Sequence, residues 1–486
     1  MASALLAAGL LAVAGASADA PGRATAAAPT HAKRLYSRGF TTWIYANPAR
    51  SERRLGYVRV GESVALRADE PQRGPGCAEA YLPVAPFGWV CPDRTVSLEL
   101  SGRYLKGMQL ARTRPALMPF LYALSNGAPM YRRLPNQEEW VRAEQGLGVA
   151  GTFRPQSWGN RGHEKLAEAR EVQARDPLPW FFDQGGAVGR AEPRGLVRRL
   201  IPHGSMLAYT RSFKHEGRTF LLSADGTAVP ADRVRPFRVS TFHGTELGKG
   251  VKLPLAFFRV KDRPKYVRAA DGTFQAVGTF VVRSFVQLES AEPELQGKSG
   301  YLPTRERLAD GRQLWAREDD ATVIRQRDAL PIGVAPGEKW VLISITNGTL
   351  VAYDGLSPVY ATLQSPGAGG VPVRGKDPVK MSTTPMGVYR VTFKHRAATM
   401  SPETGENRSF WIADVPYTQY FNAPFALHTA YWHENFGEPM SAGCVNLSPE
   451  DGRYLYEWTD PKVPADWNGA GPVGPLGKGT YIVITR

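Results

Sequence analysis

The chain has 486 residues, which at about 150 residues per domain corresponds to roughly three domains. Apolar residues make up 43% and charged residues 22%, which excludes a mostly disordered chain and a protein with many membrane spans. The net charge of +15 favours acidic partners such as nucleic acid, anionic lipid or the carboxylate-rich polymers of a cell envelope, or simply reflects a basic surface. The 50 Gly and 39 Pro indicate many turns, and therefore a chain built mainly from strands.

Residues 1–20 have the pattern of a signal peptide. A short apolar run over residues 5–16 is followed by Ala-Ser-Ala at residues 16–18 and Ala-Asp-Ala at residues 18–20, which are cleavage sites of the small-x-small type. The run is shorter than the about 20 apolar residues of a membrane-spanning helix. No Lys or Arg precedes it, so a misassigned start or an Ala-rich tail is the alternative. We expect export to the periplasm or cell envelope, with residues 21–38 as a linker.

Residues 39–97 predict a small antiparallel barrel. Short alternating apolar runs are separated there by turns rich in Gly, Pro and Arg. The order of Tyr-x-x-Pro, then Leu-Gly-Tyr-Val-x-x-Gly at residues 55–61, then Gly-Trp-Val at residues 88–90, resembles bacterial Src-homology-3-type domains.

The chain has three cysteines, Cys77, Cys91 and Cys444. The first two end a strand–turn–strand stretch, where a disulfide would close a short loop and stabilise a small barrel. In an oxidising compartment Cys444 is then left over, either as a buried inert thiol or as a nucleophile.

Residues 98–250 are expected to be a mixed region that includes a second barrel-like module at residues 201–237. The Glu, Ala and Arg of residues 164–174 predict a helix. Residues 251–335 are expected to be a β-rich connecting region. Wall binding or spacing is the usual function of such modules, and simple structural packing is the alternative.

A new unit begins at residue 338. Residues 339–345 have the pattern of a buried strand, Asn347 and Gly348 indicate a hairpin turn, and residues 481–484 predict a final strand. One short helix is expected at residues 449–458. Residues 338–486 therefore predict an all-β unit with one helical piece.

This last unit contains residue types suited to nucleophilic catalysis, namely His428, Ser441, Gly443, Cys444 and Asn446. A cysteine attacks as its thiolate, and its free pKa of about 8.5 calls for a base or a positive field. A histidine can accept that proton near neutral pH. A glycine allows a tight turn whose backbone N–H groups face a developing oxyanion.

The same residues resemble the L,D-transpeptidase catalytic domain, whose signature is a His followed, after about a dozen to sixteen residues, by Ser/Thr-His-Gly-Cys-x-Asn/Arg. Residues 384–389, Thr-Pro-Met-Gly-Val-Tyr, match the family's Thr-Pro-x-Gly-x-Tyr strand entry. Met400 and residues 416–421 match its apolar and aromatic lining. The resemblance covers roughly residues 338–486 and implies a β-sandwich with a short helix, preceded here by small β-barrel modules.

The resemblance implies a role for each matched residue. Cys444 is the nucleophile, His428 is the general base, the carbonyl of Thr429 orients that base, and the backbone of Gly443 contributes to the oxyanion pocket. The substrate-binding residues that it implies are Ser441, Ala442, Asn446, Met400, Tyr417, Tyr420 and Trp432.

One position departs from the family's signature, because Ala442 stands where His is usual. Alanine keeps the main-chain amide but lacks the imidazole that helps to shape the oxyanion pocket. Tyr431 and Trp432, in the loop after the base, belong either to the pocket wall or to the core.

Other site chemistries have less support. His428 and His433 could bind zinc, but no His-Glu-x-x-His arrangement and no further ligand cluster accompanies them. Residues 370–376 resemble a phosphate loop, yet Asp377 stands where a Ser or Thr would bind magnesium. No aromatic–basic repeat indicates nucleic acid. We therefore expect no metal, no cofactor and no nucleic-acid partner.

The sequence thus predicts an exported acyltransferase of peptidoglycan biosynthesis. The resemblance implies that Cys444 attacks peptidoglycan stem peptides, releases D-alanine and passes the acyl group to an amine of a second stem or of a protein. One alternative is a cysteine-dependent L,D-carboxypeptidase, in which water resolves the acyl-enzyme. The other is a wall-binding protein with a weakened catalytic domain, suggested by Ala442.

Overall fold

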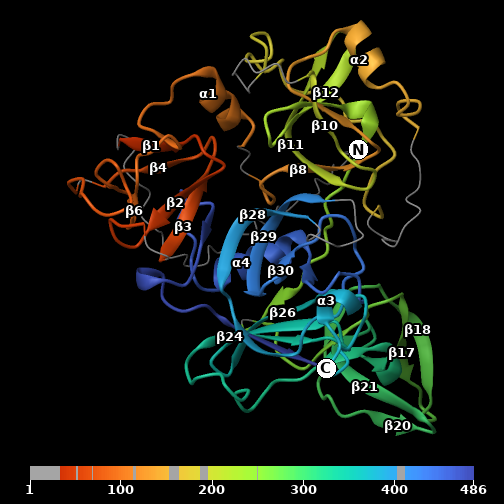
Figure 1. The fold of residues 1–486 in the computed structure, drawn as a ribbon. Coiled ribbons are helices and arrows are strands. Elements are labelled where there is room, and N and C mark those ends of the chain that lie inside the picture. Colours follow the sequence, from red (N-terminus) through yellow and green to blue (C-terminus); the bar gives the residue numbers. More distant parts are fainter. Residues whose placement is uncertain are drawn as a thin grey trace, which may run out of the picture.

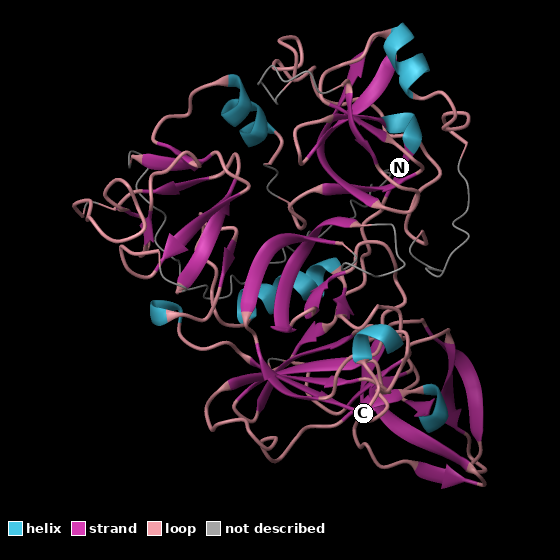
Figure 2. Ribbon diagram, viewed as in Figure 1, coloured by secondary structure: helices cyan, strands magenta, loops and turns pink. Residues whose placement is uncertain are grey.

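The structure is a computed structural model that describes residues 33–50, 53–67, 69–112, 116–152, 164–186, 195–248, 250–401 and 411–486. Strands dominate the described residues, so the prediction of a mainly β chain is confirmed (Figure 2). The predicted signal peptide and most of the predicted linker lie outside this part of the chain. Among the described residues, no helix is long and apolar enough to cross a membrane.

The N-terminal unit consists of two small sheets around one core (Figure 1). The first sheet has the order β4-β1-β7, and the strands β3, β2, β6 and β5 follow one another in the second. Their bounds are β1 Arg34–Ser37, β2 Thr41–Tyr45, β3 Arg54–Arg59, β4 Ser63–Ala65, β5 Leu82–Pro83, β6 Trp89–Val90 and β7 Val96–Ser97. The predicted linker to residue 38 is therefore too long, because the alternating burial of Leu35 and Ser37 makes residues 34–37 a strand of this unit. A disulfide joins Cys77 and Cys91.

The second unit is a strongly curved sheet with the order β10-β9-β13-β12-β11-β8-β14. It comprises β8 Leu121–Ser125, β9 Pro129–Tyr131, β10 Val197–Leu200, β11 Met206–His215, β12 Arg218–Ser223, β13 Ala228–Pro230 and β14 Val234–Pro236. The barrel-like module expected at residues 201–237 thus also takes β8 and β9 from upstream. Helix α1, Arg103–Leu110, precedes the unit, and helix α2, Gln137–Ala143, begins at a capping box formed by Asn136 and Glu139.

The helix predicted at residues 164–174 is wrong. The backbone N–H of Glu168 donates to the carbonyl of Pro236 at 2.8 Å, and the N–H of Arg238 donates to the carbonyl of Leu166 at 2.9 Å. The segment therefore forms a turn at residues 164–166 followed by an isolated bridge between Ala167 and Phe237, and this tertiary pairing overrides the helix propensity of its Glu and Ala residues.

The region between residues 251 and 335 forms two antiparallel sheets, with the orders β19-β16-β23 and β18-β17-β22-β21-β20. The strands are β16 Leu255–Phe257, β17 Arg263–Arg268, β18 Phe274–Phe280, β19 Phe285–Gln287, β20 Glu294–Gln296, β21 Ser299–Arg307, β22 Gln313–Arg317 and β23 Thr322–Ile324.

The C-terminal unit is built on a sheet with the order β15-β26-β25-β24-β33-β27. Its strands are β15 Thr245–Glu246, β24 Lys339–Ser344, β25 Thr349–Asp354, β26 Ser357–Leu363, β27 Gly387–Arg390 and β33 Tyr481–Thr485. The edge strand β15 precedes residue 338, so the sheet recruits a strand from the region predicted to be mixed. Helix α4, Pro449–Trp458, has the predicted bounds, and the short helix α3 covers Pro378–Met381.

A second layer of strands carries the signature residues. It contains β28 Phe393–Met400, β29 Ile412–Asn422, β30 Phe425–Thr429, β31 Val445–Leu447 and β32 Gly469–Ala470. Apolar side chains of both layers and of α4 share one core, including Val341, Leu427, Val445 and Leu455. The layers therefore form a sandwich that positions β30 and β31.

The hairpin of β28 and β29 joins this unit to both upstream units (Figure 1). On one side β28 pairs with β32, which pairs with β3 of the N-terminal unit. On the other side Ile412 at the start of β29 pairs with Met206 of β11. The hairpin is therefore held between the two upstream units.

Candidate active site

Cys444 sits at the end of a turn that opens β31. The Ser441 hydroxyl accepts the N–H of Gly443 at 3.0 Å and donates to the carbonyl of Cys444. Gly443 has a φ of +126°, and a Cβ there would come within 2.5 Å of the Phe425 ring. Only glycine fits this position, so the turn holds Cys444 in a fixed place with its side chain partly exposed.

The turn is also attached to the upstream Thr-Pro-x-Gly-x-Tyr motif. The Thr384 hydroxyl donates to the carbonyl of Gly443 at 2.9 Å and accepts the N–H of Gly367 at 2.8 Å. Thr384 has no exposed surface, so these bonds are shielded from water. This contact explains why the two separated motifs occur together.

His428 lies on β30, directly opposite Asn446 of the parallel strand β31. Its Nδ1 is 3.1 Å from the carbonyl oxygen of Thr429, and its Nε2 is 3.1 Å from Nδ2 of Asn446. The side chain is buried, and burial lowers the pKa of His428 to about 4. The imidazole is therefore neutral at physiological pH, which is the state that a general base requires.

Cys444 and His428, the predicted nucleophile and base, come from neighbouring segments of the second layer. Cys444 directly precedes Val445, and Val445 pairs with Leu427, the residue before His428. Cys444 therefore lies next to the segment that carries His428. The Cys444 sulfur is 3.9 Å from the carbonyl oxygen of Pro424, the residue just before β30. Burial raises the pKa of Tyr420, and the charge of Cys444 raises it further. Tyr420 therefore also lies close to Cys444.

The oxyanion role predicted for the backbone of Gly443 stays a prediction. Its N–H already donates to Ser441 Oγ, and an oxyanion would have to replace that oxygen. Ala442 is exposed and leaves the space beside the turn open.

The other predicted substrate-binding residues lie in three different settings. Tyr420 and Met400 are partly buried on β29 and β28. Trp432 is nearly fully buried, with its ring 5.8 Å from that of His428, so it forms a wall behind the base. The hydroxyl of Tyr417 donates to the carbonyl of Leu117, which turns this side chain toward the upstream part of the chain.

Two functional side chains were not assigned from the sequence. His433, weighed there as a zinc ligand, has its Nε2 3.0 Å from Oδ1 of Asn446, so one amide bridges both histidines. Asp451 of α4 accepts from Tyr360, Thr362 and the N–H of Gly244, and so fixes α4 against the sheet. Within the described part of the chain, no three His, Cys, Asp or Glu side chains gather as a metal site requires.

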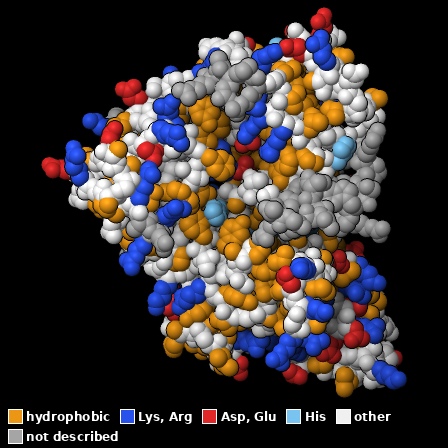
Figure 3. Space-filling model, in the orientation of Figure 1, with side chains coloured by type: hydrophobic (Ala, Val, Ile, Leu, Met, Phe, Trp, Pro, Cys, Tyr) orange, Lys and Arg blue, Asp and Glu red, His pale blue; other side chains and the backbone are white. Residues whose placement is uncertain are grey.

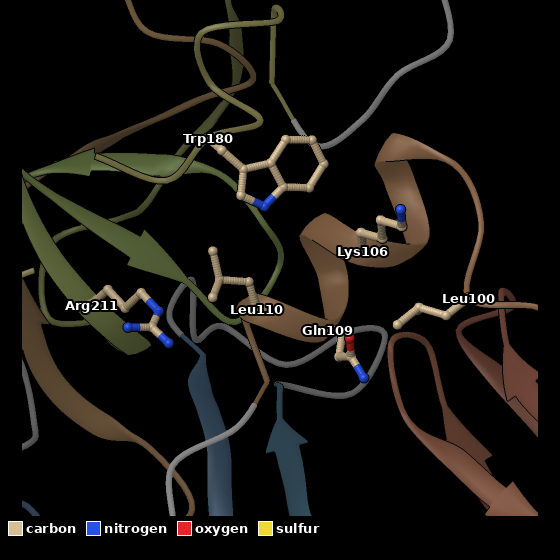
Figure 4. A pocket seen from close by; sticks show the side chains of 6 residues that line it. All are labelled: Leu100, Lys106, Gln109, Leu110, Trp180 and Arg211. Carbon is tan, nitrogen blue, oxygen red and sulfur yellow. The ribbon is translucent and has the colours of Figure 1, made fainter. Parts of the chain in front are cut away.

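A cavity also lies away from this site. On the face drawn in Figure 3, Lys and Arg side chains of the described residues occur in several separate places rather than in one patch. An open cavity of about 390 Å³ lies between α1 and the second unit, with Trp180 beside Lys106 and Leu110 (Figure 4). None of the residues that line it belongs to the motifs around Cys444.

The model of one protein family, the L,D-transpeptidase catalytic domain, matches residues 338–483. Among solved structures, the chain is similar to an L,D-transpeptidase from Stackebrandtia nassauensis, with 21% identity, a TM-score of 0.21, and coverage of 33% of this chain and 58% of that chain. It is also similar to an L,D-transpeptidase from Xylanimonas cellulosilytica, with 20% identity, a TM-score of 0.21, and coverage of 32% and 65%. The catalytic domain of an Enterococcus faecium L,D-transpeptidase has 18% identity, a TM-score of 0.23, and coverage of 31% and 100%.

The chain spans less than two thirds of the length of the first two of these proteins. At such low TM-scores the structural similarities carry no argument beyond the match of the family model. No curated protein matches the chain.

Proposed function

Because residues 338–483 are an L,D-transpeptidase catalytic domain, we propose that the protein is an exported enzyme that acts on peptidoglycan stem peptides through an acyl-enzyme on Cys444. The observation that carries the proposal is the place of a partly exposed Cys444 directly before β31, the strand that pairs with the β30 segment carrying the buried, neutral His428. A thiol that substrate can reach and a neutral imidazole whose lone pair can take a proton are the two groups that cysteine acyl transfer requires.

The proposed reaction has two acyl transfers. The Cys444 thiol gives its proton to His428, and the sulfur attacks the carbonyl carbon of the amide that links the third stem residue to the terminal D-alanine. The C–N bond breaks, His428 returns the proton to the leaving amine, and a thioester remains on Cys444. The amine of a second stem then attacks the thioester, giving up a proton, and the thiol is regenerated with a cross-link formed.

Export is the second part of the proposal. Its support is the signal-peptide pattern of residues 1–20 together with the disulfide between Cys77 and Cys91, since disulfides persist mainly in oxidising compartments. This pairing leaves Cys444 as the free cysteine of the chain.

The absence of the usual imidazole at Ala442 does not by itself indicate a decayed domain. The turn, its attachment to Thr384 and the neutral base are all in place around Cys444. These bonds support a working catalytic unit rather than a wall-binding remnant.

The test is incubation of the full chain with purified tetrapeptide muropeptides, followed by mass spectrometry. We expect cross-linked dimers that have lost one D-alanine, and none with Cys444→Ala, which removes only the sulfur. Tripeptide products without dimers would instead identify a carboxypeptidase. If Cys444→Ala retains turnover, or if the unmodified chain gives neither product, the proposal is wrong.

A further inference from the structure

His433 is a fully buried side chain that the proposed reaction does not use. It lies five residues after His428, and its ring packs 5.2 Å from that of Phe436. Its Nε2 is 3.0 Å from Oδ1 of Asn446, and the backbone N–H of Asn435 donates to its Nδ1 at 3.2 Å. Both ring nitrogens therefore have defined partners.

The backbone N–H of Asn435 fixes the direction of every bond that follows, because a backbone N–H can only donate. Nδ1 of His433 must accept, so its Nε2 carries the proton and donates to Oδ1 of Asn446. The Nδ2 of Asn446 then faces His428 as a donor to Nε2. His428 must carry its proton on Nδ1, where it donates to the carbonyl of Thr429. Each donor in this series of hydrogen bonds meets an acceptor.

We propose that His433 is a positioning residue that, through Asn446, holds His428 as the neutral tautomer with its proton on Nδ1 and its lone pair on Nε2. The catalytic consequence rests on the proposed function, in which Nε2 receives the thiol proton of Cys444 once the N–H of Asn446 moves off its lone pair. The tautomer itself follows from the bonds and does not depend on that function.

The same bonds oppose a protonated His428. An imidazolium would present an N–H at Nε2 to the N–H of Asn446, so two donors would face each other. If the amide of Asn446 rotated to offer its oxygen, its NH2 would meet the N–H of His433, whose tautomer is held by Asn435. Burial lowers the pKa of both histidines to about 4, which acts in the same direction. The imidazolium formed during the reaction is therefore a strong acid, suited to returning its proton to the leaving amine.

Few charged or titratable groups face this pair. Lys165 lowers and Glu434 raises the pKa of His433, and His433 itself lowers that of His428. The elements packed against β30 carry the titratable side chains Tyr420 on β29, Cys444 before β31 and Asp451 on α4. The carboxylate of Asp451 accepts hydrogen bonds from the hydroxyls of Tyr360 and Thr362. None of these supplies His428 with a carboxylate that would favour its protonation.

Two substitutions at the same position test the proposal. His433→Phe keeps the ring size but removes the N–H, so Asn446 can rotate and offer its oxygen to His428. His433→Gln keeps an N–H near the position of Nε2. By ¹⁵N–¹H NMR of the full chain labelled at histidine, we expect the pKa of His428 to rise by about one unit in His433→Phe and to stay near the unmodified value in His433→Gln.

The kinetic readout is the pH dependence of Cys444 acylation by a β-lactam. We expect the acid limb of the profile to move up by about one pH unit in His433→Phe, with little change at pH 8. Phe436→Leu is the matched control, because it loosens the packing around the His433 ring without removing any hydrogen bond among His433, Asn446 and His428. Its rate is expected to change equally at all pH values, with the limb unmoved.

A second variant keeps the test decisive if His433→Phe fails to fold. Asn446→Asp replaces the donor facing His428 with an acceptor, and should raise the pKa of His428 by more than about one unit. An unchanged tautomer and pKa of His428 in the folded His433→Phe or Asn446→Asp chain would overturn the inference. If the unmodified chain is not acylated at all, the proposed function fails, while the NMR titration still decides the role of His433.

Discussion

A buried ion pair connects the N-terminal unit to the hairpin beside the active site. Arg59, at the end of β3, donates through Nη1 to the carboxylate of Asp414 on β29, and the two side chains are only 8% and 5% exposed. The backbone carbonyl of Asp414 also accepts the hydroxyl of Tyr122 at 2.8 Å. A second buried cation, Arg112, lies close enough that the charge of Arg59 helps burial to lower its pKa to about 10. Asp414 opposes this positive charge, together with the more distant charges of Asp225 and Glu62.

Replacing Asp414 with Asn isolates the charge. The backbone of Asp414 has a φ of 44°, which asparagine tolerates, and its side-chain oxygen can still accept from Arg59. Removing one partner of a buried ion pair costs about 3–5 kcal/mol, and we expect the lower end because one hydrogen bond is kept. A loss of about 3 kcal/mol corresponds to roughly a 100-fold increase in the population of open states.

Hydrogen exchange of the β29 amides is the suitable assay, because a chain of several units has no single unfolding transition. Asp414→Asn should speed exchange along β29 by roughly 100-fold. The control is Asp310→Asn, which weakens an exposed pair with Arg312 and should leave exchange along β29 unchanged. Equal and small effects in the two variants would refute the argument that this pair anchors the hairpin.

Three further outcomes are expected. Thiol titration of the exported protein under denaturing, non-reducing conditions should find one free cysteine, whereas three would show that Cys77 and Cys91 are unpaired. Ala442→His should change the rate of single-turnover acylation by less than about tenfold, or about 1.4 kcal/mol, because the main-chain amide is already present. His428→Ala should slow acylation by about 100-fold or more. A larger effect at Ala442 than at His428 would contradict the assigned base. The folded pKa values of His428 and His433 are about 4 against about 6.5 unfolded, so below pH 6.5 the unfolded chain binds more protons. Stability around β30 should fall as the pH drops from about 6.5 to about 4, by roughly 3 kcal/mol per ring. Equal protection of the β30 amides against hydrogen exchange at pH 7 and pH 4.5 would argue against this.

Local patterns predicted the parts of the fold that local physics decides. Residues 449–458 form the predicted helix because Ser448 caps it, Pro449 occupies its first turn, and the acids that follow face the N-terminal end. The strands around Asn347 and Gly348 form as expected because the hairpin turn and the apolar runs agree. The spacing of His428 and Cys444 was also visible in the sequence. His428 lies near the end of β30, and Cys444 lies just before the neighbouring strand β31.

Pairing between distant segments was not readable from the sequence. Residues 164–174 have helix propensity, but the open carbonyl of Pro236 gives the N–H of Glu168 a better partner. The recruitment of β15 by β26 likewise depends on contacts more than 100 residues apart in the chain. His433 was visible as a histidine, but only the direction of the Asn435 N–H shows that it acts on Asn446 rather than on a metal.

These distant pairings connect the upstream units to the catalytic strands. The hairpin of β28 and β29 carries Tyr417 and Tyr420, and it continues through a tight turn into β30 and the base. At its outer end it is held by the pairing of Ile412 with Met206, and on its flank by β32 and β3. The hydroxyl of Tyr417 is bonded to Leu117, so even a residue expected to meet substrate is tied to the upstream chain. The upstream units therefore act as structural supports of the strand that precedes the base, whatever they bind in addition.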